Sequence, residues 1–181
     1  MRILLLGSAL ALGFSLFLTP LFIRLFAKIG WGQFIRQDGP KTHYVKRGTP
    51  TMGGIVILLA VLFGFFGAHL IEGRMPSPSG LLVIGLMVGL GLVGFLDDFS
   101  KVRRQQSLGL SPRGKVIGQL AVSVAFAWGA VSFPDENGVT PAAQGISVVR
   151  GADLLSFVQW GYWAAVVAFA VWATLIIVGT S

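Results

Sequence analysis

The stretch that decides the fold is residues 75–101, MPSPSGLLVIGLMVGLGLVGFLDDFSK. Residues 75–96 form an uncharged run of 22 residues. Such a run is long enough for an α-helix to cross the hydrocarbon core of a bilayer, about 30 Å thick. The run ends at two adjacent aspartates, Asp97 and Asp98, and Lys101 follows shortly after them. The sequence therefore predicts a membrane-spanning helix that ends in a small charged cluster.

The rest of the chain repeats the uncharged pattern. Hydrophobic residues make up 54% of the 181 residues, charged residues only 12%, and the mean hydropathy is +0.79. This composition excludes a disordered chain and an ordinary soluble domain, and the absence of cysteine excludes disulfides and thiolate metal sites. We predict an all-α, polytopic membrane protein with a single domain over 1–181. Its five transmembrane helices are expected at about 3–23, 52–71, 79–97, 115–134 and 156–179.

The basic residues are distributed unevenly among the loops. Of the 14 lysines and arginines, all but Arg2, Arg74 and Arg150 lie in or beside the loops 24–51 and 98–114. Lysine and arginine accumulate in cytoplasmic loops, so we expect these two loops in the cytoplasm and the N-terminus outside. In the external loop after the fourth span, Asn137-Gly138 is a turn signal and residues 146–149 favour a short strand. A small β-hairpin is expected there.

The acidic pair has a chemical interpretation and a structural one. Repulsion between Asp97 and Asp98 would be relieved by a divalent cation, and Mg²⁺ binds one or two carboxylates together with waters and substrate phosphates. Lys101 lies on the same helix face as both acids and could hold a phosphate oxygen. One alternative is a solvated helix end with an Asp97–Lys101 ion pair. A second is a basic stop-transfer cluster of Lys101, Arg103 and Arg104, which we prefer for the two arginines. The spacing alone favours neither interpretation.

The next helix is expected to begin with an anion-attracting end. Ser111 is a good N-cap and Pro112 suits the first helical position, so free backbone N–H groups would face the cytoplasmic surface. Arg113 and Lys115 add positive charge there. A cap combined with a membrane anchor is the alternative, and it explains two cations at a helix N-terminus poorly because they oppose the helix dipole.

Three blocks, 38–54, 95–101 and 109–119, resemble in order and spacing the phospho-N-acetylmuramoyl-pentapeptide transferase family. This family lies within the polyprenyl-phosphate N-acetylhexosamine-1-phosphate transferase superfamily. The resemblance implies a ten-helix fold, of which this chain would supply the N-terminal half. On that basis we expect the chain to be an N-terminal fragment that is inactive alone.

The resemblance also implies a reaction. Undecaprenyl phosphate would attack the UDP-linked phospho-N-acetylmuramoyl-pentapeptide (UDP-MurNAc-pentapeptide), giving lipid I and UMP for peptidoglycan synthesis at the bacterial inner (plasma) membrane. Carried over by position, Asp97, Asp98 and Lys101 would be catalytic, and both aspartates would bind Mg²⁺ with a further ligand beyond Ser181. The implied substrate-binding residues are Lys46, Thr51, Arg113 and Lys115.

The implied partners are the two substrates and the lipid bilayer, without nucleic acid, and family analogy suggests a homodimer. Two alternatives stay open. One is a sibling transferase that uses a UDP-N-acetylhexosamine with a polyprenyl phosphate. The other is a non-catalytic membrane module.

Overall fold

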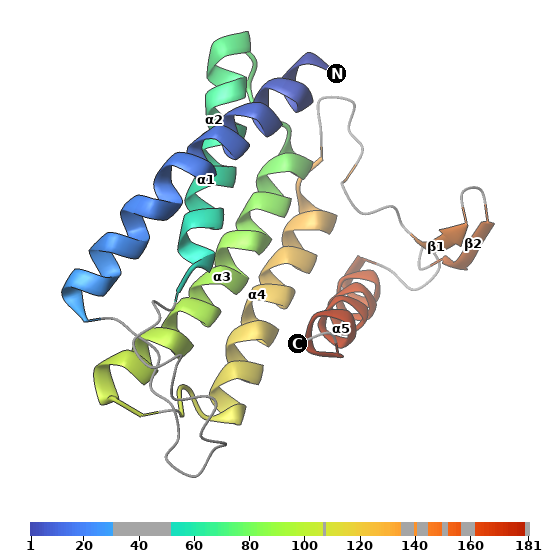
Figure 1. The fold of residues 1–181 in the computed structure, drawn as a ribbon. Helices are drawn as coiled ribbons and strands as arrows, with labels where there is room; N and C mark the ends of the chain where they lie inside the picture. The colour runs from blue at the N-terminus through green and yellow to red at the C-terminus, as the bar shows by residue number, and fades with distance from the viewer. Residues whose placement is uncertain are drawn as a thin grey trace. The chain divides into compact units, whose positions relative to one another are not determined.

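The computed structural model describes residues 1–30, 52–106, 108–134, 140, 145–149, 152–156 and 162–179. Helices dominate this part of the chain, and one pair of short strands precedes the last helix (Figure 1). The elements in chain order are α1 (Arg2–Ile29), α2 (Gly54–Glu72), α3 (Pro78–Arg104), α4 (Pro112–Ser132), β1 (Gly145–Val149), β2 (Ala152–Ser156) and α5 (Tyr162–Gly179).

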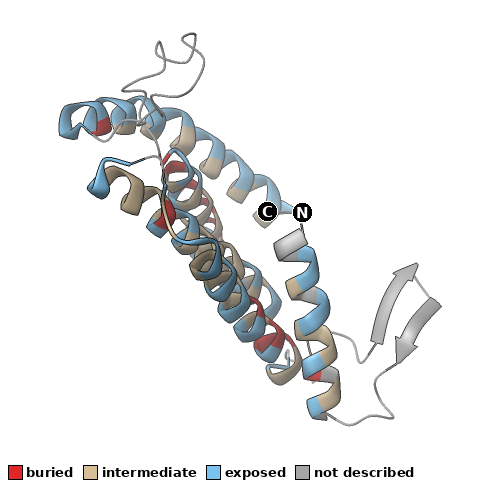
Figure 2. Ribbon diagram, turned by 90° about the horizontal axis from the view of Figure 1, so that it is seen from below, coloured by how far each residue is buried: buried red, intermediate tan, exposed pale blue. Residues whose placement is uncertain are grey.

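Four of the helices, α1 to α4, are long and apolar enough to cross a membrane. Large apolar side chains cover their outer faces, and Phe17 on α1 and Leu70 on α2 are 77% and 83% exposed. In Figure 2 the helix that starts at the N label is mostly in the colour of exposed residues. Apolar surface of this extent is favourable against lipid and costly in water. Four such helices indicate a multi-pass membrane protein.

The predicted fifth span stays a prediction. The helix α5 is present, but the apolar stretch assigned within it, Val166–Ile176, is shorter than a span. The span was expected to begin at about residue 156, where the chain still runs in β2. Hydropathy cannot separate the two elements, because Leu154 and Leu155 are as apolar as the helix that follows.

The two strands pair antiparallel, with Gly145 opposite Ser156 and Val149 opposite Ala152. The predicted strand at residues 146–149 falls within β1. The predicted turn at Asn137-Gly138 lies outside the described residues, so the hairpin expected around it stays a prediction.

The chain forms two compact units, and the first comprises residues 1–75 and 91–115. In this unit α1 and α2 run antiparallel along a seam of small residues. A Cβ added to Gly64 of α2 would lie 2.5 Å from the carbonyl oxygen of Gly7 and 2.8 Å from the Cβ of Ala11. Small residues allow two backbones to approach this closely, which is a common basis of helix association in membranes. The ring of Phe14 stacks on that of Phe63 at 4.4 Å beside the seam.

The second unit comprises residues 76–90 and 116–181. Here the first half of α3 packs on α4, because Gly89 faces the side chain of Val122 and Gly129 faces that of Leu82. The ring of Phe126 on α4 lies 6.2 Å from that of Phe169 on α5. An apolar groove in this unit is lined by Leu81 and Leu86 of α3, Phe126 of α4 and Phe133 just after α4.

Helix α3 continues beyond the predicted end of its span at residue 97, as far as Arg104. Charge marks the expected edge of the hydrocarbon region but does not stop a helix, and residues 98–104 contain neither glycine nor proline. The residue after the helix, Gln105, has a left-handed φ of 51°, and the N–H of Gln106 donates to the carbonyl of Lys101 at 3.1 Å. The acidic pair therefore lies within a helix, which fixes the relative directions of its side chains.

Candidate functional site

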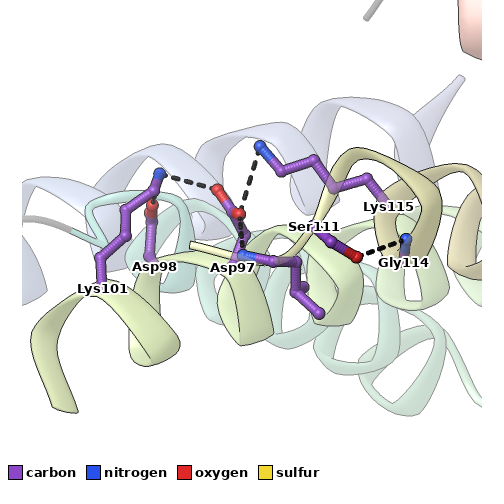
Figure 3. A network of polar contacts seen from close by, with 7 residues as sticks. Asp97, Asp98, Lys101, Ser111, Gly114 and Lys115 are labelled. Atoms are coloured by element: carbon purple, nitrogen blue, oxygen red, sulfur yellow. Dashed lines mark hydrogen bonds and ion pairs between the residues drawn. The ribbon is translucent and has the colours of Figure 1, made fainter. Parts of the chain in front are cut away.

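A network of charged side chains joins the end of α3 to the first turn of α4 (Figure 3). Asp97, Asp98 and Lys101 come from α3, and Lys115 comes from α4; all four belong to the first unit. Two carboxylates face two ammonium groups, so the formal charges of these four groups cancel. The cluster expected at the end of the third span is thus formed, and a cation from the next helix joins it.

Asp97 is the centre of the network and its most buried side chain, with 10% exposure. Its Oδ2 lies 2.7 Å from the Nζ of Lys101, and its Oδ1 lies 3.2 Å from the Nζ of Lys115. The same Oδ1 accepts a hydrogen bond of 2.8 Å from the backbone N–H of Leu110. A carboxylate this far from water is costly without partners, and both of its oxygens have them.

Lys101 bridges the two aspartates. Its Nζ lies 2.9 Å from the Oδ1 of Asp98, in addition to its contact with Asp97. The sequence spacing predicts this placement on a shared helix face. The Asp97–Lys101 ion pair of the alternative interpretation is therefore present, but the burial of Asp97 does not fit a solvated helix end. Asp98 is more open than its neighbour, with 37% of its side chain exposed.

The start of α4 is capped as the sequence predicts. The Oγ of Ser111 accepts a hydrogen bond of 3.2 Å from the N–H of Gly114, and Pro112 is the first residue of the helix. Arg113 has an exposed side chain on the first turn. Within the described residues, Arg113 forms no ion pair with Asp97 or Asp98, so it stands apart from the network. Lys46 and Thr51 lie outside the described residues, and their expected roles stay predictions.

Two features of the site do not follow from the sequence. One is the pairing of Lys115 with Asp97, since Lys115 was expected to contact substrate phosphates. The other is the contact of the Gly109-Leu110 backbone with the Asp97 carboxylate. The nearest signal for the second is Gly109 itself, which comes two residues before the N-cap Ser111. A glycine at this position is compatible with a close approach of the backbone to another group, but the sequence does not identify that group.

Asp97 and Asp98 provide two carboxylates, which is a set of protein ligands with which Mg²⁺ is commonly bound. Among the described residues no group of three histidine, cysteine or acidic side chains converges. Mg²⁺ is often held by one or two carboxylates and completes its shell with waters and substrate phosphates. Asp98 is the more accessible carboxylate, but Lys101 already contacts both acids. A metal ion bound by these two acids would share them with this ammonium group.

Comparisons with known proteins give a consistent relationship. A family model described as phospho-N-acetylmuramoyl-pentapeptide-transferase signature 1 matches residues 46–58. A protein named phospho-N-acetylmuramoyl-pentapeptide-transferase from Kineococcus radiotolerans is 50% identical over 178 residues, covering 97% of this chain and 49% of the relative. One of the same name from Pseudarthrobacter chlorophenolicus is 51% identical over 180 residues, covering 96% of this chain and 49% of the relative. No solved structure matches the chain.

The matched regions define the extent of the relationship. A third relative of the same name, from Frankia casuarinae, is 49% identical over 181 residues that cover the whole chain. The chain spans about half the length of the curated relatives it matches, 49% in each of these three cases. By sequence, this chain matches the N-terminal half of relatives named phospho-N-acetylmuramoyl-pentapeptide-transferase.

Proposed function

We propose that this chain forms part of an enzyme that transfers phospho-N-acetylmuramoyl-pentapeptide from its UDP-linked precursor to undecaprenyl phosphate. In this reaction a phosphate oxygen of the lipid forms a bond to the β-phosphorus of the UDP-linked substrate. The bond from that phosphorus to the bridging oxygen breaks, and UMP leaves with the oxygen. The products are UMP and lipid I, the lipid-linked intermediate of peptidoglycan synthesis.

The observation that carries the proposal is that lysines from two helices converge on an acidic pair. The chain that holds them is 50% identical to a named transferase over 178 residues. Phosphoryl transfer requires little covalent work from the protein and depends on positioning and charge neutralisation. Lys101 and Lys115 are ammonium donors already held at the site, and each can turn from a carboxylate to a phosphate oxygen. The match over residues 46–58 includes Lys46 and Thr51, which we assign to the nucleotide side of the substrate.

Asp97 and Asp98 are the residues that would hold Mg²⁺, with Asp98 as the more accessible of the two. The ion would supply positive charge against the diphosphate of the substrate when it is bound. The four side chains of the network have no net formal charge, so this additional charge suits a diphosphate that carries two or more negative charges. A carboxylate released from Lys101 can also accept a proton from the lipid phosphate.

The expected orientation agrees with a cytosolic nucleotide substrate. Most basic residues flank the end of α1 and the connection between α3 and α4, and the site residues lie on the two helices that this connection joins. We place this side of the protein in the cytoplasm and the N-terminus outside, in the plasma membrane of a bacterium. A dimer is part of the same proposal.

The test is UMP release from UDP-MurNAc-pentapeptide in the presence of undecaprenyl phosphate. We would assay the chain itself and a fusion protein, defined as this chain followed by the C-terminal half of the Kineococcus radiotolerans relative. Turnover by the fusion protein with this substrate and not with UDP-N-acetylglucosamine supports the proposal. A folded, membrane-inserted fusion protein that releases no UMP contradicts it, and preference for UDP-N-acetylglucosamine indicates the sibling transferase.

A further inference from the structure

The connection between α3 and α4 rests on the carboxylate of Asp97 through the backbone of two residues, Gly109 and Leu110. We propose that Gly109 is a positioning residue, whose missing side chain lets this backbone fix the Asp97 carboxylate and, through it, the ammonium group of Lys115. This inference rests on the proposed function where it concerns turnover. The geometry itself can be tested without any activity.

Gly109 has no room for a side chain. A Cβ at this position would lie 2.7 Å from both the Cγ and the backbone carbonyl oxygen of Asp97, and it would also clash with Oδ1. All of these atoms belong to a helical residue with a buried side chain, so they cannot move away as the tip of a flexible side chain could. An alanine at 109 must therefore push the α3–α4 connection away from Asp97.

The next residue makes the close approach useful. The N–H of Leu110 donates to the Oδ1 of Asp97 at 2.8 Å, and the Nζ of Lys115 lies 3.2 Å from the same oxygen. One oxygen atom therefore receives a fixed backbone donor and a long, flexible cation. The backbone donor holds the carboxylate in one rotamer, which defines where the ammonium of Lys115 comes to rest. Oδ2 is thereby left facing Lys101.

The helix cap makes the arrangement rigid from the other side. Ser111, directly after Leu110, caps α4 through Gly114, and the N–H of Lys115 donates to the carbonyl of Ser111 at 3.1 Å. The path from Gly109 to Lys115 is thus a short connection with a bonded first turn. A displacement at Gly109 is expected to reach Lys115 because little of this path can absorb it.

A first experiment uses the chain as it is, in lipid nanodiscs, and follows the hydrogen exchange of the Leu110 amide by NMR. The variant is Gly109→Ala. The matched control is Gly94→Ala, which adds the same methyl group to α3 where nothing lies within 4 Å. Loss of one hydrogen bond is expected to speed exchange at Leu110 about tenfold in Gly109→Ala and to leave it unchanged in the control. Unchanged exchange in Gly109→Ala overturns the proposal.

A second measurement reads the position of Lys115 directly. Acylation of lysines by an N-hydroxysuccinimide ester, quantified by mass spectrometry, should be faster at Lys115 in Gly109→Ala than in the wild type or the control. If Gly109→Ala does not fold, Asp97→Ala removes the shared acceptor instead and should increase both exchange at Leu110 and labelling of Lys115. Labelling of Lys115 that changes in neither variant overturns the proposal.

Turnover then separates positioning from mere stability. In the fusion protein, Gly109→Ala should lower kcat at least tenfold and leave KM for the UDP-linked substrate within about twofold, whereas Gly94→Ala changes neither. An unchanged kcat in Gly109→Ala overturns the catalytic part of the proposal. If the wild-type fusion protein shows no turnover, the proposed function fails, and exchange and labelling still decide whether Gly109 positions Asp97 and Lys115.

Discussion

Lys115, on the first turn of α4, reaches back to Asp97 on α3 and places its Nζ 3.2 Å from the Oδ1 of that carboxylate. This pair links the two helices at the charged end of the first unit. The two aspartates therefore lie in different environments. Asp97 contacts both lysines and accepts a hydrogen bond from a backbone N–H, whereas Asp98 contacts Lys101 and is more exposed. Different consequences are expected from changing each of them.

The more accessible carboxylate should matter for turnover and little for folding. In the fusion protein, Asp98→Asn should reduce the rate of UMP release by roughly 10²-fold or more, because it removes negative charge from the proposed metal and phosphate site. A Glu72→Gln variant, at the far end of α2, provides the charge-matched control. Undiminished UMP release in Asp98→Asn would refute a catalytic role for this residue.

The buried carboxylate should matter for stability as well. Asp97→Ala leaves Lys101, Lys115 and the N–H of Leu110 without their shared acceptor, so we expect a cost of about 1–3 kcal/mol in the free energy of unfolding. Asp98→Ala removes only the partly exposed ion pair with Lys101, so it should lower the free energy of unfolding by less than about 1 kcal/mol. Thermal unfolding of the chain in detergent gives the comparison. Equal shifts in the two variants would contradict the different environments.

Lys115 on α4 should contribute to kcat/KM for the UDP-linked substrate. Lys115→Ala is expected to lower kcat/KM of the fusion protein about 10- to 100-fold, the loss of a charge-assisted contact. Arg113→Ala, on the same helical turn but exposed and outside the network, should show a smaller loss. Steady-state kinetics on purified protein measures both. A Lys115→Ala variant that inserts poorly but keeps wild-type kinetics would favour a membrane anchor instead.

Metal dependence is a separate prediction. Turnover of the fusion protein should be lost on chelation with EDTA and restored by Mg²⁺, and Asp98→Asn should raise the Mg²⁺ concentration needed for half-maximal activity. On the chain itself, Mn²⁺ should broaden NMR signals around residues 97–101 in the wild type and not in Asp98→Asn. Full activity in EDTA would remove the metal from the proposed function.

The absence of cysteine makes the orientation easy to test. Ser79→Cys and Gln106→Cys place a single thiol near opposite ends of α3, at positions that are both exposed. A membrane-impermeant maleimide added to intact cells should label Ser79→Cys at once and Gln106→Cys only after permeabilisation. The reverse pattern would place the charged site outside the cell.

Local features of this protein could be read from the sequence. The uncharged run 75–96 predicts the apolar helix α3, Ser111-Pro112 predicts the start of α4, and the spacing of Lys101 places it beside both aspartates. Each of these depends on neighbours within one helical turn or on a sufficient length of apolar residues. The end of α3 at Arg104 was not predicted, because charge indicates where lipid ends and not where backbone hydrogen bonding ends.

The contacts between α3 and α4 could not be read in the same way. The Lys115–Asp97 pair and the Leu110 hydrogen bond depend on the path that the chain takes between α3 and α4. Many such paths are compatible with the same amino-acid sequence. Gly109 permits a close approach, but a permitted conformation does not identify its partner. The expectation for Lys115, a phosphate contact, therefore missed the carboxylate that holds it in this structure.

The seam between α1 and α2 has a consequence for how this part of the chain assembles in the membrane. Phe26 near the end of α1 and Gly53 just before α2 line the same groove, so the polypeptide departs from one helix and returns to the next at a single place. The tight crossing at Gly64 ties the two helices as a hairpin that can enter the bilayer as one body. Residues 52–58, the described part of the segment that carries the family match, thereby lie beside the end of α1.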